Sequence, residues 1–349
     1  MKKSSDLFNS KHYERFLANQ KQTYLEKADI PLPTLRNLKS VEPKIHEIKK
    51  ILTSHEIGTL HISKIHPSSL HSVYKIIDNK KTYILRLNLL TKRREFQFYL
   101  DSLIPGISNN SQVMYHVDIS RKIVPYDFEI IEVLPGHTLY EPTKNKTLQL
   151  STLEKAGEKL FTLHEIKGKG FGYIDVKSFI QTKKIIGIKK GWDEHIFTNF
   201  EKHLQYCLEN KLISEGQAKK LEKVFAGKKG FLKHMKYSSL LHGDVSHPNM
   251  YLSGKNLLYI DFDDALMGDP YYDVAFYATG TFGNEEWLTA FLKGYTKLEK
   301  LSKDFEERFW LYYLRTSLVK TLVRHKFGKK NKVITGNFSG RLEYALAKF

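Results

Sequence analysis

Residues 240–275 read LLHGDVSHPNMYLSGKNLLYIDFDDALMGDPYYDVA and place aspartates and asparagines at short intervals between apolar segments. Within this stretch, MYL and LLYI flank the turn-forming residues SGKN, so the sequence predicts a short β-hairpin. Because a hairpin returns the chain to its starting point, we expect Asn249, before the first strand, to lie beside Asp261, after the second. Asp244 precedes Asn249 by five residues and is expected on the loop that enters the hairpin.

This spacing predicts a phosphoryl-transfer site. An amide oxygen beside a carboxylate is a pair of hard ligands that Mg²⁺ accepts while it takes waters and phosphate oxygens at its other positions. From the entering loop, the Asp244 carboxylate would orient a hydroxyl, or accept its proton, as the hydroxyl approaches a metal-bound phosphate. Asp and Asn also favour turns and helix caps, but the joint spacing argues against that reading for all three residues.

Two motifs in this stretch resemble a known family. HGDVSHPN (242–249) resembles the HGDxxxxN catalytic loop of the aminoglycoside phosphotransferase and choline kinase group, a branch of the protein-kinase-like fold. IDFDDALMGDPYYDVA (260–275) is similar to the metal loop of that group. In this order and spacing, the two motifs are much more specific than either alone. The resemblance implies that Asp244 is the catalytic base and that Asn249 and Asp261 hold the metal.

The resemblance covers roughly residues 55–300 and implies a nucleotide site in the first half of the chain. Arg86, in YILRLN, falls where these kinases have the strand lysine that holds the α- and β-phosphates. Glu95 falls where the helix glutamate that pairs with this cation is expected. EIIEVLPGHTL resembles the hinge, where backbone groups near Glu132 and Val133 would hold the adenine edge.

The sequence departs from the family pattern at the nucleotide loop. The first hairpin of the group usually carries a Gly or Ser-Asn loop, whereas IHPSSLHSVYKI has no glycine and has Ser68 and Ser69 there. Serine hydroxyls and backbone amides can still hold phosphate. Gly243 stands where protein kinases have an arginine that reads a phosphorylated activation loop, which points to small molecules and not proteins as substrates.

The order of the expected elements defines the fold class. Amphipathic and alternating patterns predict a helix, a hairpin, a further helix and a strand, followed by a mainly helical second half. This order predicts an α+β, two-lobed arrangement with a small N-terminal antiparallel β-sheet lobe and a larger, mainly helical C-terminal lobe. The resemblance implies that this arrangement is the protein-kinase-like fold. We expect a polar, helix-prone extension at 1–40, a nucleotide-binding lobe at 41–134, and a catalytic and substrate-binding lobe at 135–349.

Composition limits the partners and the compartment. With 41% hydrophobic and 13% aromatic residues the chain is a folded globular protein, and its single cysteine, Cys207, excludes an intramolecular disulfide. No signal peptide and no apolar span of about 20 residues is present, so a cytoplasmic protein without a membrane partner is predicted. A net charge of +18 can mark a nucleic-acid or anionic-membrane partner. The lysines are spread through every predicted helix and no nucleic-acid-binding signature accompanies them, so we expect no nucleic acid partner.

The sequence thus predicts transfer of the γ-phosphoryl group of a nucleoside triphosphate, ATP, with Mg²⁺, to a small-molecule hydroxyl. An amine alcohol, an amino sugar or an aminoglycoside would suit a pocket lined by acids of the C-terminal helices, for which the candidates are Asp193, Glu194, Glu285 and Glu286. Two alternatives stay open. The glycine-free loop allows a nucleotide-binding pseudokinase or scaffold, and the charge allows a basic nucleic-acid-binding protein.

Overall fold

The computed structural model describes residue 29 and residues 43–67, 71–88, 112–118, 121–133, 135–182, 184–328 and 339–349. The chain forms two compact units that divide between Pro135 and Gly136. Except for residue 29, the expected extension at 1–40 lies outside the described residues, as does the expected helix at 91–106. In the part of the chain that the structure describes, every helix is too short or too polar to cross a membrane.

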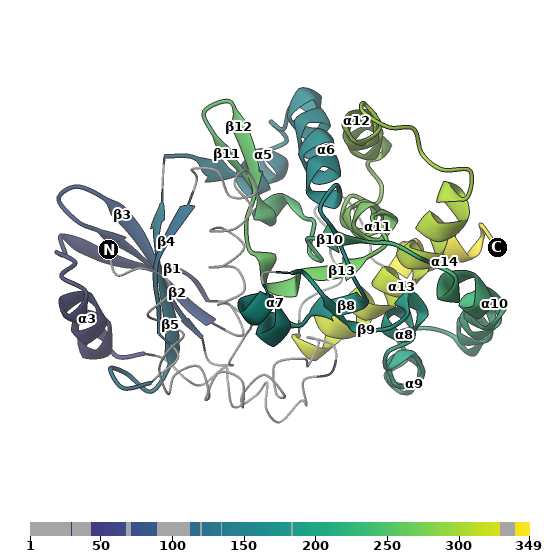
Figure 1. Ribbon diagram of the computed structural model, residues 1–349, viewed down its shortest axis with the longest axis horizontal. Helices are drawn as coiled ribbons and strands as arrows, with labels where there is room; N and C mark the ends of the chain where they lie inside the picture. The colour runs from purple at the N-terminus through teal and green to yellow at the C-terminus, as the bar shows by residue number, and fades with distance from the viewer. Residues whose placement is uncertain are drawn as a thin grey trace. The chain divides into compact units, whose positions relative to one another are not determined.

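The N-terminal unit combines one described helix with one antiparallel sheet (Figure 1). Its elements are α3 (Ile45–Ser54), β1 (His61–Pro67), β2 (His71–Ile77), β3 (Thr82–Asn88), β4 (Gln112–Asp118) and β5 (Asp127–Val133). The strands lie in the order β1-β2-β3-β5-β4, and all neighbours are antiparallel. A backbone hydrogen bond of 3.0 Å from Asp78 N–H to the Lys81 carbonyl closes the turn between β2 and β3, which confirms the predicted hairpin.

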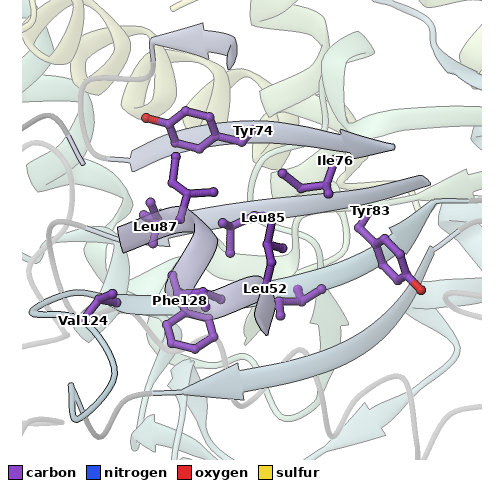
Figure 2. Packing of buried hydrophobic residues seen from close by; sticks show 11 residues of the cluster. Leu52, Tyr74, Ile76, Tyr83, Leu85, Leu87, Val124 and Phe128 are labelled. Carbon is purple, nitrogen blue, oxygen red and sulfur yellow. The ribbon is translucent and has the colours of Figure 1, made fainter. Parts of the chain in front are cut away.

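The core of this unit lies between α3 and one face of the sheet. Side chains alternate between the two faces of a strand, so one face of β2, β3 and β5 is apolar while Arg86 and Glu129 lie on the opposite face. Helix α3 covers the apolar face with residues at helical spacing. Burying each such aliphatic or aromatic side chain contributes about 2 kcal/mol. Figure 2 shows this cluster, which includes Ile48, Ile51, Leu52, Tyr74, Ile76, Tyr83, Leu85, Leu87, Val124, Phe128 and Ile130.

Two histidines join the end of α3 to strand β4. The imidazole rings of His55 and His116 have centroids 4.0 Å apart, and both rings contact Phe128. Burial lowers the pKa of His55, and it lowers the pKa of His116 to about 4, with the neighbouring His55 adding to the effect and Asp118 opposing it. Both rings are therefore neutral at pH 7.

We expect the protein to lose stability as the pH falls through this range. Because the folded-state pKa of His116 is below the ordinary value of 6.5, the unfolded chain binds the proton first. The stability is complete above pH 6.5 and is lost progressively toward pH 4, by about 2 kcal/mol after allowance for partial exposure. Urea unfolding across this range measures the loss, and His116→Leu should flatten the profile. An unchanged profile in this variant would contradict the assignment.

The C-terminal unit is mainly helical and contains two small sheets. Its α-helices are α5 (Tyr140–Lys144), α6 (Leu150–His164), α7 (Val176–Thr182), α8 (Trp192–Ile196), α9 (Phe200–Glu209), α10 (Glu215–Lys233), α11 (Tyr271–Gly280), α12 (Glu285–Tyr295), α13 (Phe305–Lys326) and α14 (Ser339–Leu346). Its strands are β6 (His137–Thr138), β7 (Lys167–Gly168), β8 (Phe171–Ile174), β9 (Gly187–Lys189), β10 (Ser238–Leu241), β11 (Met250–Ser253), β12 (Asn256–Tyr259) and β13 (Leu266–Gly268).

The two sheets carry the candidate site, and the helices surround them. One sheet has the strand order β7-β10-β13-β8-β9, and the other has the order β12-β11-β6. Helix α13 lies in the core, where both its aliphatic and its aromatic side chains are buried. Helix α11 packs along α13, and α12 packs along α6 (Figure 1).

The contact between α6 and α12 depends on two glycines. A Cβ atom at Gly157 would collide with the Phe291 carbonyl oxygen, and one at Gly294 would collide with the Glu154 carbonyl oxygen. The helices therefore pack backbone to backbone, which a larger residue would prevent.

We expect Gly294→Ala to lower the free energy of unfolding by about 2 kcal/mol, because overpacking costs more than the gain in helix propensity. Gly227→Ala is the matched control, since Gly227 is also inside a helix but has no atom within 4 Å of an added Cβ. It should raise the stability by about 0.5–1 kcal/mol. Chemical denaturation of both variants tests the pair, and equal effects of the two substitutions would contradict this packing.

Candidate active site

Strand β10 leads directly into the candidate catalytic loop. The strand is fully buried and pairs with β13 on one side and β7 on the other. Gly243 then has a φ of 81°, and a Cβ atom there would collide with the Asp264 carbonyl oxygen. Only glycine fits both the left-handed backbone and this close approach. The turn fixes the chain just before Asp244.

His242 connects the loop to the end of the hairpin. Its side chain is fully buried, and its Nδ1 atom accepts a 3.2 Å hydrogen bond from the Asp244 backbone N–H. The proton of the neutral ring is therefore on Nε2, which donates to the Ile260 carbonyl at 2.9 Å. The ring also packs on Phe262, with centroids 4.5 Å apart. His242 thus holds the backbone of Asp244 close to the residue that precedes Asp261.

The predicted hairpin forms from β11 and β12 and brings its two ends together. Met250 pairs with Tyr259, and beyond this pair the Ile260 N–H donates to the Asn249 carbonyl at 2.9 Å. Asn249 is buried, and its side-chain Nδ2 donates to the Asp244 carbonyl at 2.9 Å. Backbone and side chain of Asn249 therefore connect the catalytic loop with the second strand of the hairpin.

Asp261 has an unusual backbone conformation. Its φ of 66° and ψ of 61° are left-handed, which is uncommon outside glycine and frequently marks a functional position. A 3₁₀ turn, Phe262–Asp264, follows and contains the buried Asp263. The left-handed residue turns the chain sharply after β12.

Asp273 anchors the catalytic loop from the first turn of α11. Its fully buried carboxylate accepts hydrogen bonds from the N–H groups of His242, at 2.7 Å, and Gly243, at 3.0 Å. His164 Nε2 lies 3.2 Å from the same carboxylate, and its Nδ1 lies 2.8 Å from the Tyr295 hydroxyl. An aspartate in the first turn of a helix usually caps that helix, whereas these partners of Asp273 lie about 30 residues earlier in the chain.

His247 has a supporting position in the same loop. The Thr143 hydroxyl donates to the Leu139 carbonyl, so the His247 ring donates from Nδ1 to the Thr143 oxygen at 2.8 Å. The Tyr277 hydroxyl lies 3.2 Å from Nε2. Burial lowers the pKa of His247 to about 4, so the ring is neutral and fixes the loop by hydrogen bonds.

In the N-terminal unit, the structure places Arg86 beside an acid that sequence reasoning missed. Arg86 and Glu129 are opposite each other on β3 and β5, and their Nη1 and Oε1 atoms are 3.1 Å apart. Glu129 is fully buried, so this ion pair is well shielded from solvent. The alternation of side chains along a strand could have placed Arg86 and Glu129 on the same face of the sheet. The strand register that pairs these two residues could not be predicted from the sequence.

The other expected nucleotide contacts are only partly described. Ser68, Ser69 and Glu95 lie outside the described residues. Glu132 pairs with Tyr83 on one side and Val113 on the other, so it is inside the sheet ladder. Val133 pairs with Gln112 alone and ends the strand. Of the two, Val133 is the residue whose backbone has a side without a neighbouring strand.

The four acids expected to line one acceptor pocket are not brought together. Asp193 and Glu194 begin α8, which packs against α10, β8 and β9. Glu285 and Glu286 begin α12, which packs against α6, and Figure 1 shows α8 and α12 at opposite edges of the C-terminal unit. The prediction of one pocket with four acids is therefore wrong. The sequence shows two adjacent acids in each helix, but it does not give the distance between the two helices.

The donor atoms of this loop would suit Mg²⁺. Asn249 and Asp261 offer an amide oxygen and a carboxylate at the joined ends of the hairpin. Across the described ranges, no group of three or more His, Cys, Asp and Glu side chains could hold a metal by itself. A cation that takes one or two protein ligands and completes its shell with phosphate and water is the type that fits.

Comparison with protein families gives one match that covers most of the chain. The model described as "Phosphotransferase enzyme family" matches residues 61–308. A comparison with curated protein sequences found no match.

Solved structures with a similar fold agree with this match. A thermostable variant of aminoglycoside phosphotransferase APH(4)-Ia, in ternary complex with AMP-PNP and hygromycin B, has a TM-score of 0.65 at 15% identity, covering 87% of this chain and 98% of that chain. A choline/ethanolamine kinase family protein from Mesorhizobium loti has a TM-score of 0.58 at 14% identity, covering 87% and 93%. Spectinomycin phosphotransferase APH(9)-Ia, with ADP and spectinomycin, has 0.56 at 11%, covering 88% and 100%. The predicted kinase-like fold is confirmed.

Proposed function

Because the chain belongs to the phosphotransferase enzyme family, we propose that it transfers the γ-phosphoryl group of ATP to a hydroxyl group of a small molecule. The observation that carries this proposal is the hydrogen-bonded unit of His242, Asp244 and Asn249 with Ile260, the residue before Asp261. Three residues that phosphoryl transfer requires come from one loop and one hairpin, and backbone bonds hold these segments together.

Asp244 is the general base in this proposal. Its carboxylate orients the acceptor hydroxyl and accepts its proton, the hydroxyl oxygen bonds to the γ-phosphorus, and the bond from that phosphorus to the β-phosphate oxygen breaks. The supports at its backbone, from His242 and Asn249, limit the positions that this carboxylate can occupy.

Asn249 and Asp261 are the metal ligands. The bond from Asn249 Nδ2 to the Asp244 carbonyl directs the amide nitrogen toward the loop, which leaves Oδ1 as the donor for a cation. A Mg²⁺ ion bound there supplies charge neutralisation for the β- and γ-phosphates. Asp261 has a left-handed backbone conformation, and such strained conformations cluster at ligand-binding positions.

Residues of the N-terminal unit contact the nucleotide. Arg86 neutralises the α- and β-phosphates, with Glu129 and Glu95 as bracing acids, and Ser68 and Ser69 bind phosphate oxygens. The backbone near Glu132 and Val133 holds the adenine edge, with Val133 the better placed of the two.

The acceptor belongs to the hydroxyl-bearing amines and sugars. Relatives with this fold were solved with hygromycin B or spectinomycin, and another is described as a choline/ethanolamine kinase family protein. An amine alcohol, an amino sugar or an aminoglycoside is therefore the acceptor class that we propose.

The decisive experiment measures ATP consumption with Mg²⁺ across a panel of amine alcohols, amino sugars and aminoglycosides, with mass spectrometry of the product. Turnover that yields a phosphorylated acceptor supports the proposal. Thermal stabilisation by ATP without turnover on any acceptor would instead identify a nucleotide-binding scaffold and overturn the proposal.

A further inference from the structure

Helix α10 has a buried face and an outward face of contrasting composition. Ala218, Leu221, Phe225 and Leu232 are buried at helical spacing. At about 100° per residue, the opposite line of the helix is exposed and contains no acid. We call this line the outward face of α10; it consists of Gly216, Lys219, Lys220, Lys223, Gly227, Gly230 and, just past the helix, His234.

The lysines of this face outnumber the acids around them. Lys219, Lys220 and Lys223 form no ion pair with any other described residue, whereas Lys228, on the inner side, contacts Glu307 at 2.5 Å. Lysines of another exposed helix, Lys293 and Lys297 of α12, are each paired with an acid of α6. The exposed Glu215 and Glu222 flank Lys219 along one edge of this face, whereas the lysines outnumber the acids over the exposed surface of the helix, so the outward face of α10 carries net positive charge.

The glycines of this face leave the helix backbone open to a partner. A Cβ atom at Gly227 or Gly230 would meet nothing within 4 Å, so packing among the described residues does not require either glycine. Each glycine nevertheless disfavours the helix relative to alanine. The helix is secured at its start by a capping box between Ser214 and Gln217.

An exposed aromatic side chain lies at the end of the same helix. Tyr237 follows His234 by three residues and is 81% exposed, which makes it the most exposed of the large hydrophobic side chains that the structure describes. Lys233 and Lys236 beside it are also exposed. Proteins bind single-stranded nucleic acid by combining positive charge that follows the phosphate backbone with aromatic side chains on which the bases stack.

We propose that the outward face of α10 and Tyr237 bind single-stranded nucleic acid, with lysines on the phosphates and the tyrosine ring stacked on a base. A membrane surface fits less well, because Ala218, Leu221, Phe225 and Leu232 are buried and the outward face of α10 has no large apolar side chain to insert. The lysines look evenly dispersed in the sequence, but the helix gathers three of them on one face. This activity is independent of phosphoryl transfer.

Fluorescence anisotropy with labelled oligouridine RNA and oligothymidine DNA at several salt concentrations tests the proposal. We expect binding of one or both, and the triple variant Lys219→Gln, Lys220→Gln, Lys223→Gln should reduce the slope of log K against log salt by about 2. Tyr237→Ala should weaken binding about tenfold or more, while Tyr237→Phe, which keeps the ring, should bind as the wild type does.

The matched control is Lys293→Gln, Lys297→Gln, Lys300→Gln, which removes the same charge from another exposed surface. It should leave binding nearly unchanged, and phosphoryl transfer should be unchanged in every variant. Equal loss in both triple variants would mean that only the net charge matters and would overturn the proposal. Absence of oligonucleotide binding would do the same, as would binding to anionic vesicles or duplex DNA that exceeds binding to single strands.

Discussion

Replacing Asp244 by asparagine is expected to lower kcat for phosphoryl transfer by about 10²–10⁴-fold, the usual contribution of a general base. The amide has the same size and can still accept a hydrogen bond, but it cannot take the proton of the acceptor hydroxyl. The backbone bonds to His242 and Asn249 involve main-chain atoms of Asp244 and persist in the variant. The KM for ATP should therefore change little, since the proposed role of Asp244 concerns the acceptor.

Steady-state kinetics with the best acceptor of the panel measures this effect, and the thermal unfolding midpoint shows whether the fold is intact. Asn249→Ala and Asp261→Asn form the comparison, because they should raise the Mg²⁺ concentration needed for half-maximal rate, which Asp244→Asn should not. An Asp244→Asn enzyme within tenfold of wild-type kcat would remove Asp244 from the role of base.

The local parts of this site could be predicted from the sequence because they depend on neighbours in the chain. Turn-forming residues between two apolar segments define the β11–β12 hairpin, and the hairpin by itself brings Asn249 close to Ile260. The same logic gave the hairpin that turns at Asp78. In each case the deciding contacts span few residues, so spacing and residue type are sufficient.

The parts that could not be predicted depend on contacts between distant segments. Asp273 bonds to a loop 30 residues earlier, and Glu129 meets Arg86 across 43 residues. A carboxylate near a proline and a helix start looks like a local cap in the sequence, and nothing local indicates that its partners are elsewhere. The acids of α8 and α12 failed for the same reason, because residue type does not determine which helices are neighbours.

Replacing Asp273 by asparagine is expected to affect both stability and catalysis. The buried carboxylate accepts from His242 N–H and Gly243 N–H on different oxygens, and an amide can accept on only one of these sides. One N–H group would then face an NH₂ group in a fully buried site, at a cost of about 3 kcal/mol in the free energy of unfolding. Because these two N–H groups fix the residues just before Asp244, a shift of the loop should also lower kcat, by about tenfold to 100-fold.

Asp269→Asn separates the positioning role of Asp273 from a purely structural one. Asp269 is equally buried and lies four residues earlier, but its carboxylate accepts from Arg308 at 3.0 Å and from Tyr312 at 2.6 Å, away from the catalytic loop. This variant should lose similar stability, while its folded fraction, assayed well below the unfolding midpoint, keeps its kcat. If Asp273→Asn behaves in the same way, Asp273 only stabilises the fold. If the Asp273 carboxylate holds the catalytic loop, kcat should fall in Asp273→Asn but not in Asp269→Asn, and the KM for ATP should be retained. The defect then lies in the placement of Asp244 and not in the amount of folded protein.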